Sequence, residues 1–219
     1  MSDEAQDKGF LMGLQSYGDR DFSIYMRRAF ARSQGFTLEE LERPIIGIAF
    51  THSRFNPCHR HFPELLEAVK RSIASAGGTA MEFPTTSLHE STLAPNSMKF
   101  RNLMAMDTEE MIRAQPMDAV ILMGGCDKTV PAQLMGAVSA GKPAIQLIGG
   151  PQSTSRYKDD RVGACTDCRK FWVKFRAGEI TVALLLTSVR SVLYSVRVHP
   201  IPGSVDSLLG LLQHDGEPI

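Results

Sequence analysis

Residues 43–83 read RPIIGIAFTHSRFNPCHRHFPELLEAVKRSIASAGGTAMEF and carry the clearest fold signal in the chain. The apolar run at 45–50, IIGIAF, is rich in β-branched residues and predicts a buried strand. Residues 63–76 place leucine, valine and isoleucine at helical spacing, and a glycine pair ends the pattern. Residues 79–83, TAMEF, are typical of a second strand. The stretch therefore predicts one β-α-β unit.

The same alternation continues beyond this unit. Residues 97–114 have helical periodicity, within which Asp107 could cap a second helical segment. Strands are predicted at 118–123, DAVILM, and at 143–148, PAIQLI, with a helix between them at 131–140 that opens on a proline. Short connections between alternating strands and helices favour parallel pairing. The sequence therefore predicts an α/β fold with a mainly parallel central sheet flanked by helices.

The composition narrows the class of protein. The 219 residues are 43% hydrophobic and 22% charged, as in one ordinary soluble domain or part of a larger one. Basic and acidic residues number 24 each, so no excess of positive charge favours nucleic acid. The apolar run at 182–198 is interrupted by two arginines and is short for a membrane span. The N-terminus lacks signal-peptide and transit-peptide features, so we expect a cytoplasmic protein that binds neither nucleic acid nor membrane.

Three loops that follow predicted strands hold the residues with chemical potential. They are THSRFNPCHRH at 51–61, PTTSLHEST at 84–92 and GGCDKT at 124–129. In a parallel sheet these loops leave from one edge, where ligands bind. The candidates that this edge would bring together are Cys58, Glu90, Cys126, Asp127 and Lys128.

The residue types suggest two kinds of metal ligand. Two thiols at equivalent loop positions favour a shared zinc or iron–sulfur centre, although a single free cysteine is commonly a small buried hydrophobe. Glu90 and Asp127 carry the hard oxygen ligands that magnesium prefers, although a lone loop carboxylate is usually a cap or solvated surface. Lys128 has only donors, so it can bind a cation only if it is neutralised or converted to a carbamate.

Other motifs are weaker. GGCDKT differs in spacing from a phosphate-binding loop and places Asp127 where that loop needs glycine, so an NTPase is not favoured. Cys165 and Cys168 form a C-x-x-C, which could be a redox pair or half of a zinc site, but no second such pair exists. Histidines 52, 59, 61 and 89 flank the candidate edge and could bind metal or exchange protons.

With these motifs in view, the chain resembles the dihydroxy-acid dehydratases and their sugar-acid relatives, the phosphogluconate, arabonate and xylonate dehydratases. The resemblance runs from about residue 17 to residue 180. It rests on RPIIGIAFTHSRFNPCH, GGTAMEFPTTSLHEST, FRNLMAMDTEEMIRAQPMDAVILMGGCDKTVPAQLMGA, PAIQLIGGP and VGACTDCRKFWVKFRAGEI. Together these segments are far more specific than any single motif.

The resemblance implies an iron–sulfur hydro-lyase that converts a 2,3-dihydroxy or sugar acid to a 2-keto acid. By matched motif, Cys58 and Cys126 would bind the cluster, of the 2Fe-2S or 4Fe-4S type. Glu90, Asp127 and Lys128 would form the Mg²⁺ shell, and the family's lysine is carbamylated. The family also implies a homo-oligomer for its full-length members.

The C-terminal part departs from the family pattern. We expect residues 1–180 to be a dehydratase N-terminal domain and 181–219 to be a divergent tail, produced by truncation or a frameshift. The family's third cluster cysteine, a further magnesium carboxylate and the serine base are not found, so the catalytic base is expected in a missing C-terminal half. Two alternatives follow: a non-catalytic fragment that associates with a homologue or aggregates, or a small zinc or redox protein that uses Cys165 and Cys168.

Overall fold

The computed structural model describes most of the N-terminal part of the chain and short pieces beyond it. The described residues are 9–14, 18–152, 155–157, 159–163, 165–177, 197–199, 211–214 and 217–218. The chain separates into two compact units, Met1–Asp167 and Cys168–Ile219, and each is described by itself.

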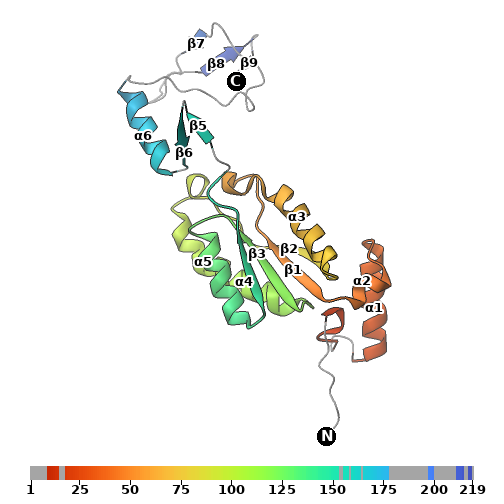
Figure 1. The fold of residues 1–219 in the computed structure, drawn as a ribbon. Coiled ribbons are helices and arrows are strands. Elements are labelled where there is room, and N and C mark those ends of the chain that lie inside the picture. The colour runs from red at the N-terminus through yellow and green to blue at the C-terminus, as the bar shows by residue number, and fades with distance from the viewer. Residues whose placement is uncertain are drawn as a thin grey trace. The chain divides into compact units, whose positions relative to one another are not determined.

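A four-stranded parallel sheet forms the centre of the first unit (Figure 1). Its strands are β1 (Ile45–Phe50), β2 (Thr79–Pro84), β3 (Ala119–Gly124) and β4 (Ala144–Ile148), in the order β2-β1-β3-β4. All neighbouring pairs are parallel. The predicted α/β fold with a parallel central sheet is therefore confirmed.

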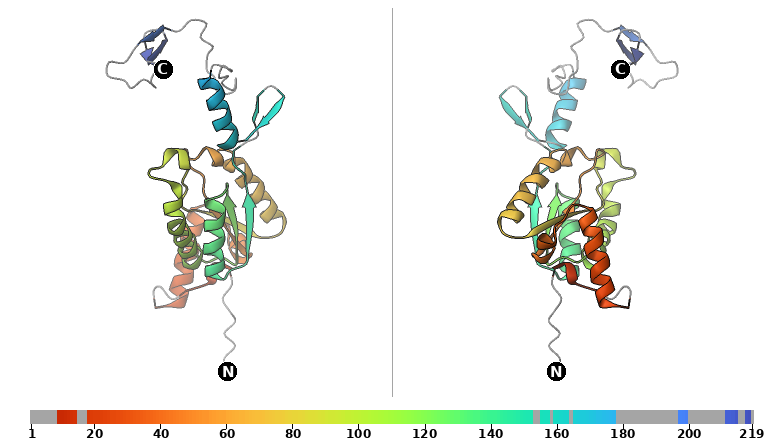
Figure 2. Two further views of the ribbon diagram at one scale, coloured as in Figure 1. Left: turned by 90° about the vertical axis from the view of Figure 1, so that its left-hand side faces the viewer. Right: turned by 90° about the vertical axis from the view of Figure 1, so that its right-hand side faces the viewer.

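The sheet is accompanied by α-helices. They are α1 (Arg20–Ser33), α2 (Leu38–Glu42), α3 (Phe62–Ser75), α4 (Arg101–Ala114) and α5 (Thr129–Ala140). Four short 3-10 helices, η1 (Gly9–Leu11), η2 (Pro57–His59), η3 (Glu90–Thr92) and η4 (Ser97–Phe100), lie in the connections. Helix α3 packs on one face, and α4 and α5 pack on the other, so that the strands lie between them in Figure 2.

The alternation of side chains along the strands builds two core layers. On β1, Ile45 and Ala49 point into the layer beneath α4 and α5, whereas Ile48 points toward α3. Period two is the reason, since successive side chains of a strand face opposite ways. Ile112 of α4 and Phe62 of α3 are both fully buried and anchor the two layers. Each layer then stabilises the sheet through buried apolar area.

Helices α4 and α5 pack closely through a glycine. A Cβ on Gly136 of α5 would lie 2.5 Å from the carbonyl oxygen of Ala105 in α4.

Helix α4 runs without a break through Asp107, so the prediction of a second helical segment capped by Asp107 is wrong. The Asp107 carboxylate instead accepts hydrogen bonds from the backbone N–H of Thr86 at 2.6 Å and from the Thr86 hydroxyl at 2.8 Å.

At the amino ends of the strands, the Asp118 side chain connects η1 to the sheet. Its Oδ1 accepts from the backbone N–H of Gly9 at 2.9 Å, and its Oδ2 accepts from that of Ile45 at 2.8 Å. Helices α1 and α2 follow this tether and lie near the amino end of β1 (Figure 1). One carboxylate thus links η1, β1 and the start of β3.

The remaining elements are short. Strands β5 (Ser155–Tyr157) and β6 (Asp160–Val162) form an antiparallel pair, and α6 (Cys165–Arg176) crosses the boundary between the units. In the second unit, β7 (Arg197–His199), β8 (Leu211–His214) and β9 (Glu217–Pro218) form an antiparallel sheet. The expected boundary at residue 180 and most of the expected tail lie outside the described residues. Within the described part, no helix is long and apolar enough to cross a bilayer.

Candidate metal centre

Three loops leave the carboxyl edge of the sheet, and hydrogen bonds tie them together. The hydroxyl of Thr51, at the end of β1, donates to the carbonyl oxygen of Met123 in β3 at 2.7 Å. The amide of Asn56 donates to the Ser87 hydroxyl at 3.1 Å and so joins the loop after β1 to the loop after β2. Thr51 and Asn56 are both nearly inaccessible to solvent. The first of these hydrogen bonds is buried and the second is partly buried, so both polar groups are satisfied within the protein.

The two predicted cluster cysteines meet at this edge. Cys58 lies in η2, which opens on Pro57, and its side chain is buried; Cys126 comes two residues after the end of β3 and is half-buried. A hydrogen bond from the Cys58 thiol lowers the pKa of the Cys126 thiol, while burial and the nearby Asp127 carboxylate act in the opposite direction. Cys126 Sγ also lies 3.4 Å from Asp127 Oδ1.

Lys128 links the two predicted magnesium carboxylates. Its ammonium donates to Asp127 Oδ2 and, at 3.2 Å, to Glu90 Oε2. The hydrogen bond with Asp127 raises the pKa of Lys128 and lowers the pKa of Asp127, because each group stabilises the charge of the other. The lysine side chain is only 14% exposed, whereas the carboxylates of Glu90 and Asp127 are 61% and 70% exposed.

The five candidates therefore form one continuous chain of contacts. It runs from Cys58 through Cys126, Asp127 and Lys128 to Glu90. The described residues contain no group of three or more histidine, cysteine, aspartate or glutamate side chains gathered as a metal site. The edge instead offers two thiols side by side and, next to them, two carboxylates that already hold one positive charge between them.

The sequence does not distinguish His59 from the other histidines of these loops, yet it is the one of the four whose side chain is buried. It is 1% exposed, and its ring stacks on Phe62 with centroids 4.2 Å apart. Burial lowers the pKa of His59 to about 4, although a hydrogen bond to the Thr51 carbonyl acts in the opposite direction. A Cβ on Gly125 would collide with His59 Nε2, so glycine is required for this approach. A neutral imidazole from the loop of Cys58 therefore packs directly against the loop of Cys126.

A neighbouring histidine ties in the loop after β4. His61 Nε2 hydrogen-bonds to the carbonyl oxygen of Gly149 at 3.0 Å, and its ring meets that of Phe62 edge-on at 5.4 Å. A Cβ on Gly149 would collide with the Phe62 ring. The loops after β1, β3 and β4 are thus packed against one another without room for side chains at two of their glycines.

The alternative C-x-x-C pair lies elsewhere in the chain, in α6. Cys168 is free and exposed, and the side chain of Cys165 lies outside the described part of the structure.

The two remaining histidines, His52 and His89, lie in the loops of the candidate edge. His52 stacks on Phe50, and His89 accepts a hydrogen bond from the Ser91 backbone N–H.

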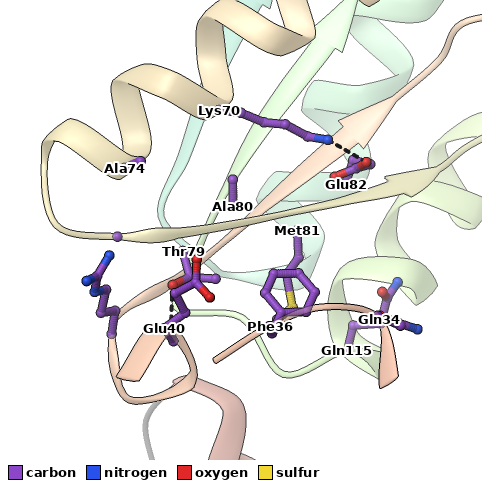
Figure 3. Close-up of a pocket in the computed structure, with 12 residues that line it drawn as sticks. Gln34, Phe36, Glu40, Lys70, Ala74, Thr79, Ala80, Met81, Glu82 and Gln115 are labelled. Atoms are coloured by element: carbon purple, nitrogen blue, oxygen red, sulfur yellow. Dashed lines mark hydrogen bonds and ion pairs between the residues drawn. The ribbon is translucent and has the colours of Figure 1, made fainter. Parts of the chain in front are cut away.

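A cavity of about 690 Å³ lies at the β2 edge of the sheet, away from these residues (Figure 3). Figure 3 shows Lys70 of α3 reaching toward Glu82 of β2. These two side chains lie 2.6 Å apart, and both line the cavity. None of the five candidate residues lines it. A charged pair at an exposed strand edge is typical of protection against unwanted strand pairing.

Comparison with known proteins supplies the family context of this edge. A family model described as dihydroxy-acid/6-phosphogluconate dehydratase N-terminal matches residues 43–196. An L-arabonate dehydratase from Azospirillum brasilense is 44% identical over 81% of this chain and 31% of its own length. A D-xylonate dehydratase from Caulobacter vibrioides is 40% identical over 73% of this chain and 27% of its own length. A dihydroxy-acid dehydratase from Clostridium novyi is 38% identical over 62% of this chain and 25% of its own length.

These matches cover most of this chain but a minor part of each relative. The chain spans between 25% and 31% of the length of these three relatives. The family model begins at residue 43, just before β1, and includes all five candidate residues.

Proposed function

Because the chain belongs to the dihydroxy-acid/6-phosphogluconate dehydratase N-terminal family, we propose that it provides the iron–sulfur and magnesium ligands of a hydro-lyase. The substrate would be a 2,3-dihydroxy or sugar acid, the class named for the relatives from Azospirillum and Clostridium. The product would be a 2-keto acid. We further propose that residues 1–180 form the N-terminal domain of such an enzyme and that catalysis needs a base from outside it.

The observation that carries this proposal is the unbroken run of contacts from Cys58 to Glu90. Two adjacent thiols, one with a lowered pKa, match the thiolate ligands that iron–sulfur clusters take. The oxygens of Asp127 and Glu90 suit magnesium, which commonly uses one or two carboxylates together with water and substrate oxygens. The two carboxylates already attract one positive charge, the Lys128 ammonium, and this lysine would join the magnesium shell only once it is neutralised or converted to a carbamate.

The reaction requires help at two carbon atoms. Removal of water from a 2,3-dihydroxy acid breaks a C2–H bond and the C3–O bond, and the resulting enol becomes the 2-keto acid. Bound metals would act as Lewis acids on the substrate oxygens, making the C2 proton more acidic and the 3-hydroxyl a better leaving group. Asp127 and Glu90 would hold the cation, and Cys58 and Cys126 would hold the cluster. Buried His59 would keep the two cysteine loops in contact and restrict water behind them.

Anaerobic reconstitution tests the ligand assignment. The chain is incubated with iron and sulfide, desalted, and examined for bound iron and for charge-transfer absorbance in the visible range. We expect Cys58→Ser and Cys126→Ser to lower both, and Cys168→Ser, which alters an exposed thiol in α6, to leave them unchanged.

A parallel assay tests the reaction. Reconstituted protein is mixed with Mg²⁺ and a panel of dihydroxy and sugar acids, alone and with a C-terminal segment of a relative, and keto acid is measured. Keto-acid formation that disappears with Asp127→Asn would support the hydro-lyase assignment. Stoichiometric zinc binding that survives Cys58→Ser but not Cys168→Ser would instead favour the zinc protein.

A further inference from the structure

Helix α4 contacts both loops that carry the candidate cation ligands. At its first residue, Arg101 Nη2 donates to the backbone carbonyl oxygen of Asp127 at 2.8 Å. One and a half turns further on, the Asp107 carboxylate accepts from the Thr86 N–H and hydroxyl, in the loop that leads to Glu90. One rigid element thus bridges the loop after β3 and the loop after β2.

We propose that Arg101 is a positioning residue for the divalent cation site: by gripping the Asp127 carbonyl it holds the carboxylate of Asp127 and the amine of Lys128 in register with Glu90. The inference rests on the proposed function for the cation but assigns a role to a residue outside the ligand set.

The packing around Arg101 supports a positioning role. Its Nε is buried and has no hydrogen-bond partner among the described residues. An arginine held at one edge by a carbonyl presents its remaining donors in a fixed direction, which a lysine cannot do. Helix α4 itself packs closely on α5, because a Cβ on Gly136 would lie 2.5 Å from the Ala105 carbonyl oxygen. The Asp127 carbonyl is therefore hydrogen-bonded to a helix that is closely packed on its neighbour.

The grip on Asp127 affects the site because the ligands are consecutive in the chain. Asp127 supplies a carboxylate, Lys128 follows it directly, and the lysine ammonium bridges back to Glu90 on the other loop. A rotation of the peptide plane at Asp127 would change the direction of both side chains. Groups that orient metal ligands without touching the metal commonly change affinity by about 10- to 100-fold when they are removed.

Arg113 on the same helix provides a matched control. Its Nη2 donates to the carbonyl oxygen of Ser139 in α5 at 2.7 Å, and its Nε donates to Glu109 at 2.9 Å. Like Arg101, it joins α4 to a backbone carbonyl of the following segment with one charged hydrogen bond. It lies at the far end of the helix from the candidate edge, so its loss should affect stability without affecting the cation ligands.

The experiment measures Mn²⁺ as a probe of the magnesium site. Dissociation constants are obtained from the electron paramagnetic resonance signal of free Mn²⁺ for the parent chain, Arg101→Met, Arg101→Lys and Arg113→Met, and melting temperatures are recorded in parallel. We expect Arg101→Met to weaken Mn²⁺ binding about 10- to 100-fold, Arg101→Lys to recover part of the loss, and Arg113→Met to change affinity less than about threefold. The melting temperatures of the two methionine variants should fall by similar amounts.

The outcomes separate the inference from the function on which it rests. Equal Mn²⁺ affinity in the parent and Arg101→Met would overturn the positioning role and leave the cation site in place. Equal weakening in Arg101→Met and Arg113→Met would also overturn it, since the effect would then be general loosening of α4. A parent chain that takes up no Mn²⁺ would contradict the proposed cation site itself, and the role of Arg101 would fall with it.

Discussion

Acidification should destabilise the metal-free protein through one buried imidazole. Burial lowers the pKa of His59 from 6.5 to about 4, so the folded state keeps this ring neutral where the unfolded chain has protonated it. The stabilising contribution is fully present above pH 6.5 and is lost as the pH falls from 6.5 to about 4. At 1.36 kcal/mol for each pH unit, the loss in the free energy of unfolding is about 3 kcal/mol.

The assay is urea denaturation of the metal-free chain at a series of pH values from neutrality to 4, followed by circular dichroism. We expect His59→Gln to remove most of the pH slope in this window, because glutamine does not titrate. His89→Gln, at another histidine of the same edge, is the control for loss of a histidine as such. An unchanged slope in His59→Gln, or an equal reduction in His89→Gln, would refute the view that burial of His59 causes the pH dependence.

Three further changes test the packing of the domain. Ile112→Ala should lower the free energy of unfolding by about 2 to 5 kcal/mol in urea titrations, because this side chain is fully buried beneath the sheet; a loss below about 1 kcal/mol would contradict its place in the core. Gly136→Ala should lower the melting temperature by forcing apart α4 and α5, where the added Cβ would lie 2.5 Å from the Ala105 carbonyl, and an unchanged melting temperature would refute that close approach. Lys70→Met should change the free energy of unfolding by less than about 1 kcal/mol, because its pair with Glu82 is partly exposed; a larger loss would show that the pair is structurally important.

Most strands and helices of the first unit could be predicted from the sequence, because apolar residues recur there at strand or helix spacing. The helix predicted at 63–76 is observed as Phe62–Ser75, because its apolar face and terminal glycines are local signals. The start of α5 was predicted less well: the helix begins at Thr129 rather than at residue 131. Proline is tolerated throughout the first turn of a helix, so Pro131 does not mark its first residue. The place of β4 in the order of the sheet could not be predicted either. PAIQLI is as apolar as a central strand, yet β4 is the sheet edge and Ile145 is 69% exposed.

The candidate site likewise has features that the sequence predicts and features that only the structure shows. That Cys58 and Cys126 lie at one edge follows from topology, because parallel strands send their loops to one edge, whereas the contact between the two thiols is seen only in the structure. His59 and Arg101 could not be ranked from sequence, since neither belongs to a spaced motif. The burial of His59 depends on Phe62 and on the missing side chain of Gly125. The role of Arg101 depends on the distance between α4 and a backbone carbonyl, which no residue pattern encodes.

Cross-linking with dibromobimane, which becomes fluorescent when it bridges two neighbouring thiols, tests whether the two proposed cluster ligands, Cys58 and Cys126, lie together in solution. The metal-free chain is treated under anaerobic conditions, digested and analysed by mass spectrometry. We predict a bimane bridge between the peptides of Cys58 and Cys126, lost in either serine variant and kept in Cys168→Ser. Separate labelling of these two cysteines, or a bridge from Cys126 to Cys168, would contradict the convergence of the loops on one edge of the sheet.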